Sequence, residues 1–284
     1  MTKETAVTPI MLAELDAIGQ FLAANMNARI APEQWKQSLV HPWCLDRPNF
    51  GMKLTHQGQL VGTFLAIYSD QRIRGQVERI CNAHTWCVLP AYRSHALSLA
   101  VALVRQPGYH FSVLTPNANV TAVFRFLKFK ELDNRVSMFP NVPSLARATF
   151  VDDGARILAR LSTSDRTDFE NHSSIPWLQH GVVVDSSDSY SWFVFKQRHW
   201  RGVPGAEIIH VSDSGTFNRC LSAVRNYLLF RKGMSWTRID TRLVGAHPRF
   251  SYKTFRSQPK MFMSTSLREG DITDLYSELA SLDI

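Results

Sequence analysis

The stretch "LPAYRSHALSLAVALV", Leu89–Val104, marks a change from extended chain to helix. A run of β-forming residues precedes it, Pro90 ends that run, and an apolar helical pattern follows. We expect the helix to begin near Arg93, which leaves its first backbone amides without carbonyl partners. Such amides carry partial positive charge, and with the Arg93 side chain they predict a site for a pyrophosphate. The residues that would let an anion approach are small: Ser94, Ala96 and Ser98.

Strand and helix signals alternate on both sides of this stretch. Residues 10–40 carry a helical pattern, and two extended runs about a Gln57-Gly58 turn predict a hairpin. A third run at 76–89 leads into the quoted stretch, and a short strand and a short helix follow it at 108–127. The two strands that flank the helix are therefore expected to be parallel neighbours. This order predicts an α/β (α+β) fold with a mixed central sheet flanked by helices.

The second half of the chain repeats this order of elements without repeating the residues. Strands, a helix over 217–233 and a further strand predict a second half built like the first. Residues 151–175 are crowded with Ser, Thr, Asp and Asn, as a linker is. The predicted organisation is a first domain at 1–150, this linker-like segment, and a second domain at 176–284. We expect the acidic stretch 267–284 to complete the second sheet.

The composition excludes several classes of protein. The chain has 284 residues, 45% of them hydrophobic and 20% charged, and a formal net charge of +8, as in a globular rather than a disordered protein. It shows no apolar run long enough to cross a bilayer and no signal-peptide pattern, so the cytoplasm is expected. The basic residues are scattered, which argues against nucleic-acid binding. The cysteines lack metal-ligand spacing, so we expect buried free thiols and no metal site: Cys44, Cys81, Cys87 and Cys220.

The quoted stretch resembles the acetyl-CoA-binding motif of the GNAT N-acetyltransferase superfamily. That motif reads V-x-P-x-Y-R, then Q/R-x-x-G-x-G/A, then an apolar helix. The residues that match its first part are Val88, Pro90, Tyr92 and Arg93. Ala96 and Ser98 stand at the two glycine positions. An alanine there adds one methyl group where the backbone should approach the ligand.

A second landmark of the superfamily is an Asn after the next strand, a Tyr seven residues on, and a Gly-Phe that closes the short helix. These positions hold Asn117, Phe124 and Lys128-Phe129 here, so the spacing is kept while two residues differ. The resemblance covers about residues 10–140. It implies a GNAT-like fold for the first half and, from the element order, a related second half.

The resemblance also implies an acyl-CoA site. The residues whose amides would hold the CoA pyrophosphate are Arg93, Ser94, His95, Ala96, Leu97 and Ser98. The strand edge at Cys87 and Val88 would pair with the pantetheine arm and polarise the thioester carbonyl, and Asn117 would hydrogen-bond that arm. In many members a phenol at the position of Phe124 protonates the leaving thiolate, which phenylalanine cannot do.

The strand before the motif offers two candidates for the base that takes the proton from the attacking amine, His84 and Glu78. On a regular strand Asn82, His84, Trp86 and Val88 share one face, so His84 is expected beside the cofactor. Its ordinary pKa of about 6.5 suits a base. The alternatives are a hydrogen-bonded strand histidine at His84 and a solvated ion pair at Glu78.

These features predict a cytoplasmic bacterial acyltransferase that moves an acyl group from acetyl-CoA or another acyl-CoA to an amine or hydroxyl of a small molecule or sugar. One alternative is a non-catalytic GNAT-like protein that binds CoA or a partner, favoured by Phe124 and the missing glycines. Another is a nucleic-acid or anionic-polymer binding module, favoured only by the net charge. Asn117 has the alternative role of a helix cap after Pro116. In the second half, Asp213 precedes a helix and would repel phosphate, which predicts a degenerate GNAT-like domain.

Overall fold

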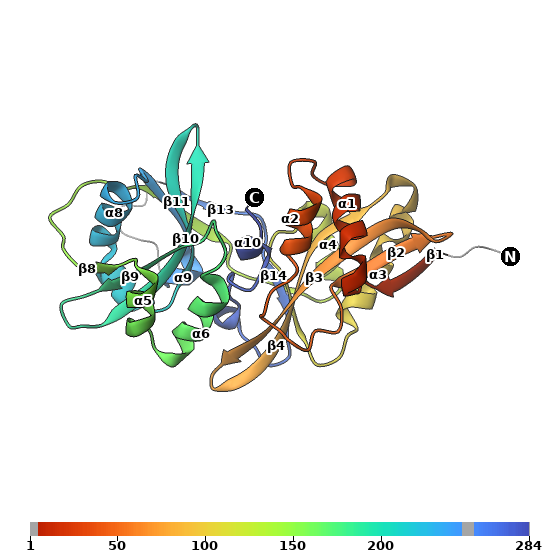
Figure 1. The fold of residues 1–284 in the computed structure, drawn as a ribbon, viewed down its shortest axis with the longest axis horizontal. Coiled ribbons are helices and arrows are strands. Elements are labelled where there is room, and N and C mark those ends of the chain that lie inside the picture. Colours follow the sequence, from red (N-terminus) through yellow and green to blue (C-terminus); the bar gives the residue numbers. More distant parts are fainter. Residues whose placement is uncertain (1–4, 246–252, 284) are drawn as a thin grey trace. The chain divides into compact units, whose positions relative to one another are not determined.

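The computed structural model describes residues 5–245 and 253–283, which form two compact units (Figure 1). The first unit comprises residues 5–132, 259–272 and 276–283. The second comprises residues 133–245, 253–258 and 273–275. Each unit contains a seven-stranded mixed sheet with helices packed on it, as the sequence predicted.

The strands of the first unit are β1 (Thr5–Pro9), β2 (Gly51–His56), β3 (Gln59–Ile73), β4 (Gln76–Val88), β5 (His110–Val113), β6 (Lys130–Glu131) and β14 (Met261–Met263). Their order in the sheet is β1-β2-β3-β4-β5-β14-β6. The hairpin predicted about Gln57 and Gly58 is β2–β3. Among the strand pairs in the described part of this sheet, β4 and β5 are parallel and the others antiparallel, which confirms the predicted parallel neighbours.

The helices of the first unit are η1 (Leu12–Glu14), α1 (Leu15–Asn25), α2 (Pro32–Gln37), η2 (Pro90–His95), α3 (Ala96–Val104), α4 (Ala118–Phe126), η3 (Glu269–Asp271) and α10 (Glu278–Ser281). The helical pattern at 10–40 is confirmed by α1 and α2, and Pro32 takes the first helical position of α2, where its missing amide costs nothing. The strand β1 before them was not predicted. None of the helices in the described ranges has the length and hydropathy to cross a membrane.

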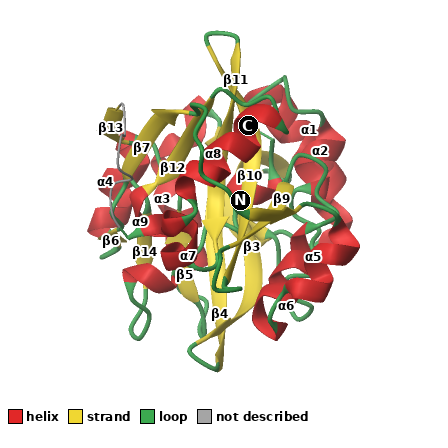
Figure 2. Ribbon diagram, turned by 90° about the vertical axis from the view of Figure 1, so that its left-hand side faces the viewer, coloured by secondary structure: helices red, strands yellow, loops and turns green. Residues whose placement is uncertain are grey.

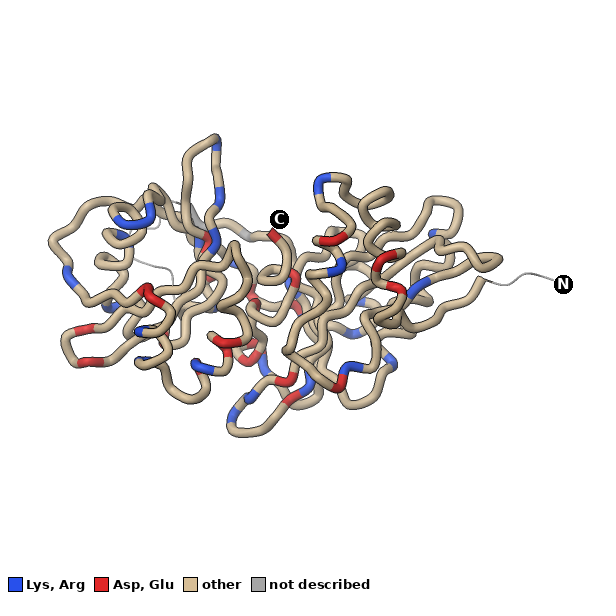
Figure 3. The backbone as a smooth tube through the Cα atoms, viewed as in Figure 1, with Lys and Arg blue, Asp and Glu red and all other residues tan. Residues whose placement is uncertain are grey.

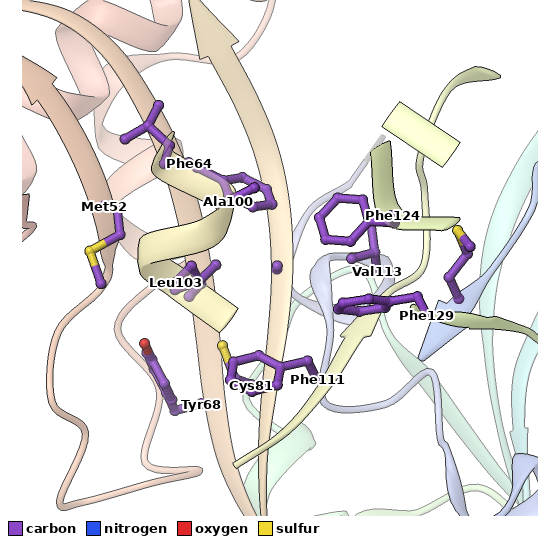
Figure 4. Close-up of a cluster of buried hydrophobic side chains, with 14 of the residues drawn as sticks. Met52, Phe64, Tyr68, Cys81, Ala100, Leu103, Phe111, Val113, Phe124 and Phe129 are labelled. Atoms are coloured by element: carbon purple, nitrogen blue, oxygen red, sulfur yellow. The ribbon is translucent and has the colours of Figure 1, made fainter. Parts of the chain in front are cut away.

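The core of the first unit lies between the sheet and helices α3 and α4. Leu99, Ala100 and Leu103 form the buried side of α3, spaced as one face of a helix requires. Phe124 of α4 and the nearby Phe129 pack into the same cluster, and Figure 4 shows these rings beside the sheet. Burial of large aromatic side chains supplies much of the stabilising apolar area of such a core.

The strands of the second unit are β7 (Arg135–Pro140), β8 (Thr149–Val151), β9 (Gln179–Val184), β10 (Tyr190–Trp200), β11 (Val203–Val211), β12 (Trp236–Asp240) and β13 (Lys253–Arg256). Their order is β13-β7-β12-β11-β10-β9-β8. Strands β11 and β12 are parallel, and the other strand pairs in the described part of this sheet are antiparallel.

The helices of the second unit are α5 (Gly154–Arg160), α6 (Thr163–His172), α7 (Ser214–Arg219), α8 (Leu221–Phe230) and α9 (Thr241–Val244). Phe193, Phe195, Phe217 and Tyr227 dominate the core between the sheet and α7–α8. In both units a long antiparallel pair, β3–β4 or β10–β11, leads through helix into a parallel strand (Figure 2). The repeated element order expected from the sequence is therefore present.

The division between the units lies earlier than the sequence predicts. Residues 133–150 belong to the second unit, because β7 pairs with β12 and β13 of the second sheet. The segment 151–175 is folded, since Asp153 and Ser162 cap helices α5 and α6 by accepting hydrogen bonds from backbone amides. These two polar side chains therefore satisfy free amides at helix starts and do not mark a linker.

The expectation that 267–284 completes the second sheet is wrong. The described residues 267–272 and 276–283 belong to the first unit, where they form η3 and α10. The segment just before them supplies β14, which pairs with β5 and β6 of the first sheet. The backbone groups on that edge of β5 are thereby satisfied, as buried peptide groups must be.

Positions of basic and acidic residues are interspersed along the backbone of both units (Figure 3). All four cysteines are free and buried, as predicted. Within the described residues, no group of three or more His, Cys, Asp or Glu side chains is placed to hold a metal ion.

Candidate functional site

One edge of β4 is free over its second half. β4 pairs with β5 only over Ile80–Asn82, because β5 ends at Val113 and the chain then turns toward α4. No strand in the described part of the chain pairs with this edge from Ala83 to Val88. Unpaired N–H and C=O groups on a strand edge can bind an extended chain through main-chain hydrogen bonds.

A β-bulge at Thr85 reverses the alternation of side chains along β4. Phe64 of β3 pairs with Trp86, whereas the following residue of β3 pairs with His84, so Thr85 is the extra residue. Its φ of 49° lies in the left-handed region, which a β-branched residue rarely adopts. Because paired residues share a face, Trp86 lies with Phe64 on the side of the α3–α4 core, and His84 lies on the other side. The expectation that alternate residues over Asn82–Val88 share one face is wrong for this reason.

The turn after β4 is the 3₁₀ helix η2 and not the start of the α-helix. Pro90 begins η2, and the Tyr92 amide donates to the Leu89 carbonyl over 2.9 Å. The Ala96 amide donates to the Arg93 carbonyl, and α3 begins there. The prediction of a helix start near Arg93 is therefore wrong, since the tight i→i+3 hydrogen bonds of η2 come first. The Ala96 amide is thus used within the chain, and the Arg93 guanidinium is a positively charged group that this turn offers an anion.

An open pocket of about 390 Å³ adjoins the end of β4. Of the residues that the sequence analysis assigned to CoA binding, those that line it are Cys87, Val88, Arg93 and Ala96. Those that do not are Ser94, His95, Leu97, Ser98 and Asn117. The Ser98 hydroxyl donates to the His95 carbonyl over 2.6 Å, and Leu97 is 41% exposed. The pocket is thus lined by the end of β4 and by one side of the turn that follows it.

The pocket also draws on segments that the sequence analysis did not assign to it. The additional lining residues are Asn25 and Met26 where α1 ends, Trp86 on β4, and Asn119, Val120 and Val123 of α4. These segments are far apart in sequence, and no local pattern marks them as neighbours. Among the described residues that line the pocket, Arg93 alone is charged, and none is a carboxylate or an imidazole. The lining therefore favours a ligand with one anionic end and an apolar body.

His84 lies outside the pocket lining. Its side chain is only 2% exposed, and its Nδ1 and the Thr85 Oγ1 are 2.9 Å apart in a hydrogen bond. Burial, with a smaller contribution from the neighbouring His41, lowers the pKa of His84 to about 3. The imidazole is therefore neutral at neutral pH and costly to protonate, and the structure does not place it as a base in the pocket.

Glu78 lies near the opposite end of β4 from Val88. At about 3.3 Å per strand residue, the two are about 30 Å apart. The Glu78 Oε2 is 3.0 Å from the His110 Nε2, and the His110 Nδ1 is 2.9 Å from the Ser264 Oγ. Glu78 thus belongs to a local hydrogen-bonded group, and the structure does not bring it to the pocket.

Phe124 is a core residue. Its side chain is fully buried, and its ring packs against Phe64, Trp86 and Phe129 at centroid distances of 6.0, 6.1 and 4.7 Å. It does not line the pocket. The position that resembles the acid of the superfamily therefore stabilises the fold here.

Asn117 caps helix α4. Its Oδ1 accepts a hydrogen bond from the Val120 amide over 3.0 Å, and its backbone has the extended conformation of an N-cap residue. The capping role weighed for Asn117 is therefore the one that the structure shows.

The loop of the second unit that corresponds to the β4 turn has the opposite charge. Asp213 caps α7 and accepts a hydrogen bond from the Thr216 amide over 2.6 Å. An open pocket of about 520 Å³ beside it is lined by both Asp213 and Asp165. The Arg219 guanidinium lining this pocket is paired with Asp185. The carboxylates at this loop would repel a phosphate.

No protein-family model matches the sequence, and no curated protein does. Solved structures do match. A GCN5-related N-acetyltransferase from Anabaena variabilis has a TM-score of 0.60 at 12% identity, over 91% of this chain and 72% of that one. A glucosamine N-acetyltransferase region of a fungal multi-domain β-N-acetylglucosaminidase has a TM-score of 0.59 at 13% identity, over 93% of this chain and 38% of that one. Saccharomyces cerevisiae N-myristoyltransferase with bound myristoyl-CoA has a TM-score of 0.50 at 10% identity, over 97% of this chain and 84% of that one. This chain has the GNAT fold.

The GNAT fold confirms the resemblance drawn from the β4 turn. The matches extend over both units, since each covers more than nine tenths of the chain. Sequence identities of 10–13% show that the fold is shared, but they do not assign roles to single residues. Within the GNAT fold, those roles rest on the geometry given above.

Proposed function

We propose that the chain binds an acyl-CoA in the pocket at the end of β4 and transfers its acyl group to an amine or hydroxyl of a small molecule or sugar. The observation that carries this proposal is the free edge of β4 from Ala83 to Val88, which leads into a pocket lined by Arg93. The pantetheine arm is extended and carries amides that can hydrogen-bond to such an edge. The Arg93 guanidinium is suited to the pyrophosphate, because charge-assisted hydrogen bonds to phosphate are strong.

The chemistry proposed is direct attack on the thioester. The C–N or C–O bond forms as the C–S bond breaks, and free amides on the β4 edge can stabilise the negative charge on the carbonyl oxygen. Since the described lining residues include no imidazole or carboxylate, a neutral amine fits the pocket better than a hydroxyl. Its nitrogen attacks the thioester carbon, its proton passes to solvent, and the CoA thiolate leaves and takes up a proton from solvent. An amino sugar fits this requirement, and a protein of similar fold is named a glucosamine N-acetyltransferase.

Calorimetry with CoA and acetyl-CoA tests the binding half of the proposal. Ala96→Glu places a carboxylate in the pocket and is expected to abolish binding through repulsion of the pyrophosphate. Leu97→Glu is the matched control, because it adds the same charge at the next residue, which is 41% exposed and outside the pocket lining. We expect the control to bind as the wild type does. Absence of binding to the wild type at millimolar cofactor, or equal binding by Ala96→Glu, would contradict the proposal.

The second candidate function is that of a non-catalytic acyl-CoA-binding protein. Two observations favour it: the fully buried Phe124 at the acid position, and the pocket lining without a base. Release of free CoA thiol from acetyl-CoA across a panel of amines, glucosamine included, distinguishes the two functions. Binding without acceptor-dependent thiol release would support the second. Strongly salt-dependent DNA binding without CoA binding would support a nucleic-acid module instead.

We further propose that the second unit is a GNAT-like domain without a cofactor site. Its parallel pair β11–β12, with α7 and α8 between, follows the plan of β4, α3 and β5. The Asp213 carboxylate lies in the loop between β11 and α7, whereas Arg93 lies in the turn between β4 and α3, and this difference in charge supports the absence of a phosphate site in the second unit. Calorimetry should accordingly give a stoichiometry of one acyl-CoA for each chain.

A further inference from the structure

Trp86 separates the pocket from the aromatic core of the first unit. The bulge at Thr85 turns its indole toward the α3–α4 side of the sheet, and the same residue lines the pocket. The indole stacks on Phe64 with ring centroids 4.8 Å apart and an interplanar angle of 25°. It meets Phe124 edge-on at 6.1 Å. One face of this wall is therefore the pocket, and the other is closely packed core.

The core behind Trp86 is filled. Phe64 is 1% exposed and Phe124 fully buried, and Phe129 packs against Phe124 with centroids 4.7 Å apart (Figure 4). Protein cores are packed as densely as organic crystals, so a chain of methylenes cannot enter this layer without displacing a ring. Contacts between rings in such a layer can be replaced only at a cost in packing.

We propose that Trp86 restricts the acyl group to short chains such as acetyl. This inference rests on the proposed binding of acyl-CoA along the β4 edge. With the pyrophosphate at Arg93 and the arm beside Val88 and Cys87, the thioester end of the ligand comes next to Trp86 along the strand. The indole there occupies the volume into which a longer acyl chain would extend. The substrate class is thus a short-chain acyl-CoA.

Truncation of Trp86 should open the pocket toward the core. Trp86→Ala removes the indole wall and leaves a cavity bounded by Phe64 and Phe124. Each methylene moved from water into an apolar cavity favours binding by about fourfold. Octanoyl-CoA carries a chain long enough to use such a cavity, and acetyl-CoA does not. The variant is therefore expected to change the relative affinity for these two ligands.

The experiment measures the affinities of CoA, acetyl-CoA and octanoyl-CoA by calorimetry. We expect the wild type to bind octanoyl-CoA no more tightly than acetyl-CoA, and Trp86→Ala to raise the octanoyl-to-acetyl affinity ratio at least tenfold. Trp86→Leu, which keeps an apolar contact with the core, should raise it by less and provides the test if Trp86→Ala does not fold. Phe126→Ala is the matched control, since it also removes an aromatic ring, but from a residue of α4 that is 72% exposed and outside the pocket lining. Its ratio should stay within twofold of the wild type.

The outcomes separate this inference from the proposed function. If CoA itself does not bind to the wild type, the acyl-CoA site is refuted and the role of Trp86 with it. If CoA binds but the wild type prefers octanoyl-CoA tenfold or more, only the restriction by Trp86 is overturned. The same holds if CoA binds and both Trp86 variants keep the wild-type ratio, because the acyl chain then points away from the core.

Discussion

Three histidines of the second unit should make its stability depend steeply on pH: His172 is buried, and His180 and His210 are half-buried with ring nitrogens shielded from solvent. His180 of β9 stacks parallel to Trp192 of β10 at a centroid distance of 5.9 Å, and His210 of β11 meets Trp192 at 4.7 Å. Phe169 of α6 packs edge-on to His180 at 4.9 Å, and His172 of the same helix is fully buried. Burial lowers the pKa of His172 and His180 to about 4 and that of His210 to about 3.

The direction of the effect follows from these pKa values. An unfolded histidine has a pKa of about 6.5, so between pH 6.5 and about 4 the unfolded chain binds protons that the folded unit does not. Above pH 6.5 the three histidines do not reduce the free energy of unfolding of the second unit, and this free energy falls as the pH is lowered below that value. One proton contributes about 1.4 kcal/mol per pH unit, and three give a slope approaching about 4 kcal/mol per pH unit near pH 5. Asp274 opposes the effect at His210, because its charge raises that pKa.

Urea unfolding at pH 7, 6 and 5, combined with hydrogen exchange of peptides from β9–β11, measures the free energy of unfolding of the second unit. His180→Phe is the internal control, since a phenyl ring keeps the stacking between Phe169 and Trp192 without a titratable group. It should reduce the slope by about one proton, or about 1.4 kcal/mol per pH unit. A wild-type slope of one proton or less between pH 6 and 5 would refute the reasoning, because the buried imidazoles would then be charged in the folded state.

Two further predictions concern the motif residues of the first unit. Phe124→Tyr buries a hydroxyl in the layer formed by Phe64, Trp86 and Phe129, and should cost about 1–3 kcal/mol in chemical denaturation without raising the rate of acyl transfer; an increased rate would show that the position reaches the thioester. Asn117→Ala should cost about 1 kcal/mol through loss of the α4 cap, and Asn117→Ser should restore most of it. Equal stability of these two variants would argue against the capping role.

Local patterns in the sequence were enough to predict most of the helices and strands. The Gln57-Gly58 turn, the apolar spacing of α3 and the order of strand, helix and strand all depend on neighbours along the chain. Such patterns also led to the GNAT fold, because the V-x-P-x-Y-R turn has its own local signature. The prediction of a linker at 151–175 was less successful, since capping residues and linker residues have the same composition.

The candidate site was predicted only in part. Cys87, Val88, Arg93 and Ala96 follow one another closely along the chain and do line the pocket. Residues from α1 and α4 complete it, and nothing in their local sequence indicates this. The regular alternation of side chains along a strand predicted that His84 faces the cofactor. The extra residue Thr85 reverses that alternation, so His84 lies on the other face of the sheet.

The sequence by itself determined the secondary structure around the β4 turn, the repeated order of elements and the free state of the cysteines. These properties depend on short-range periodicity and residue type. Only the tertiary structure decided which strands share a sheet, which face Trp86 and His84 occupy, and which distant segments border the pocket. Strand register, a bulge at Thr85 and the return of β14 to the first sheet set these features, and they arise from hydrogen bonds between residues far apart in the chain.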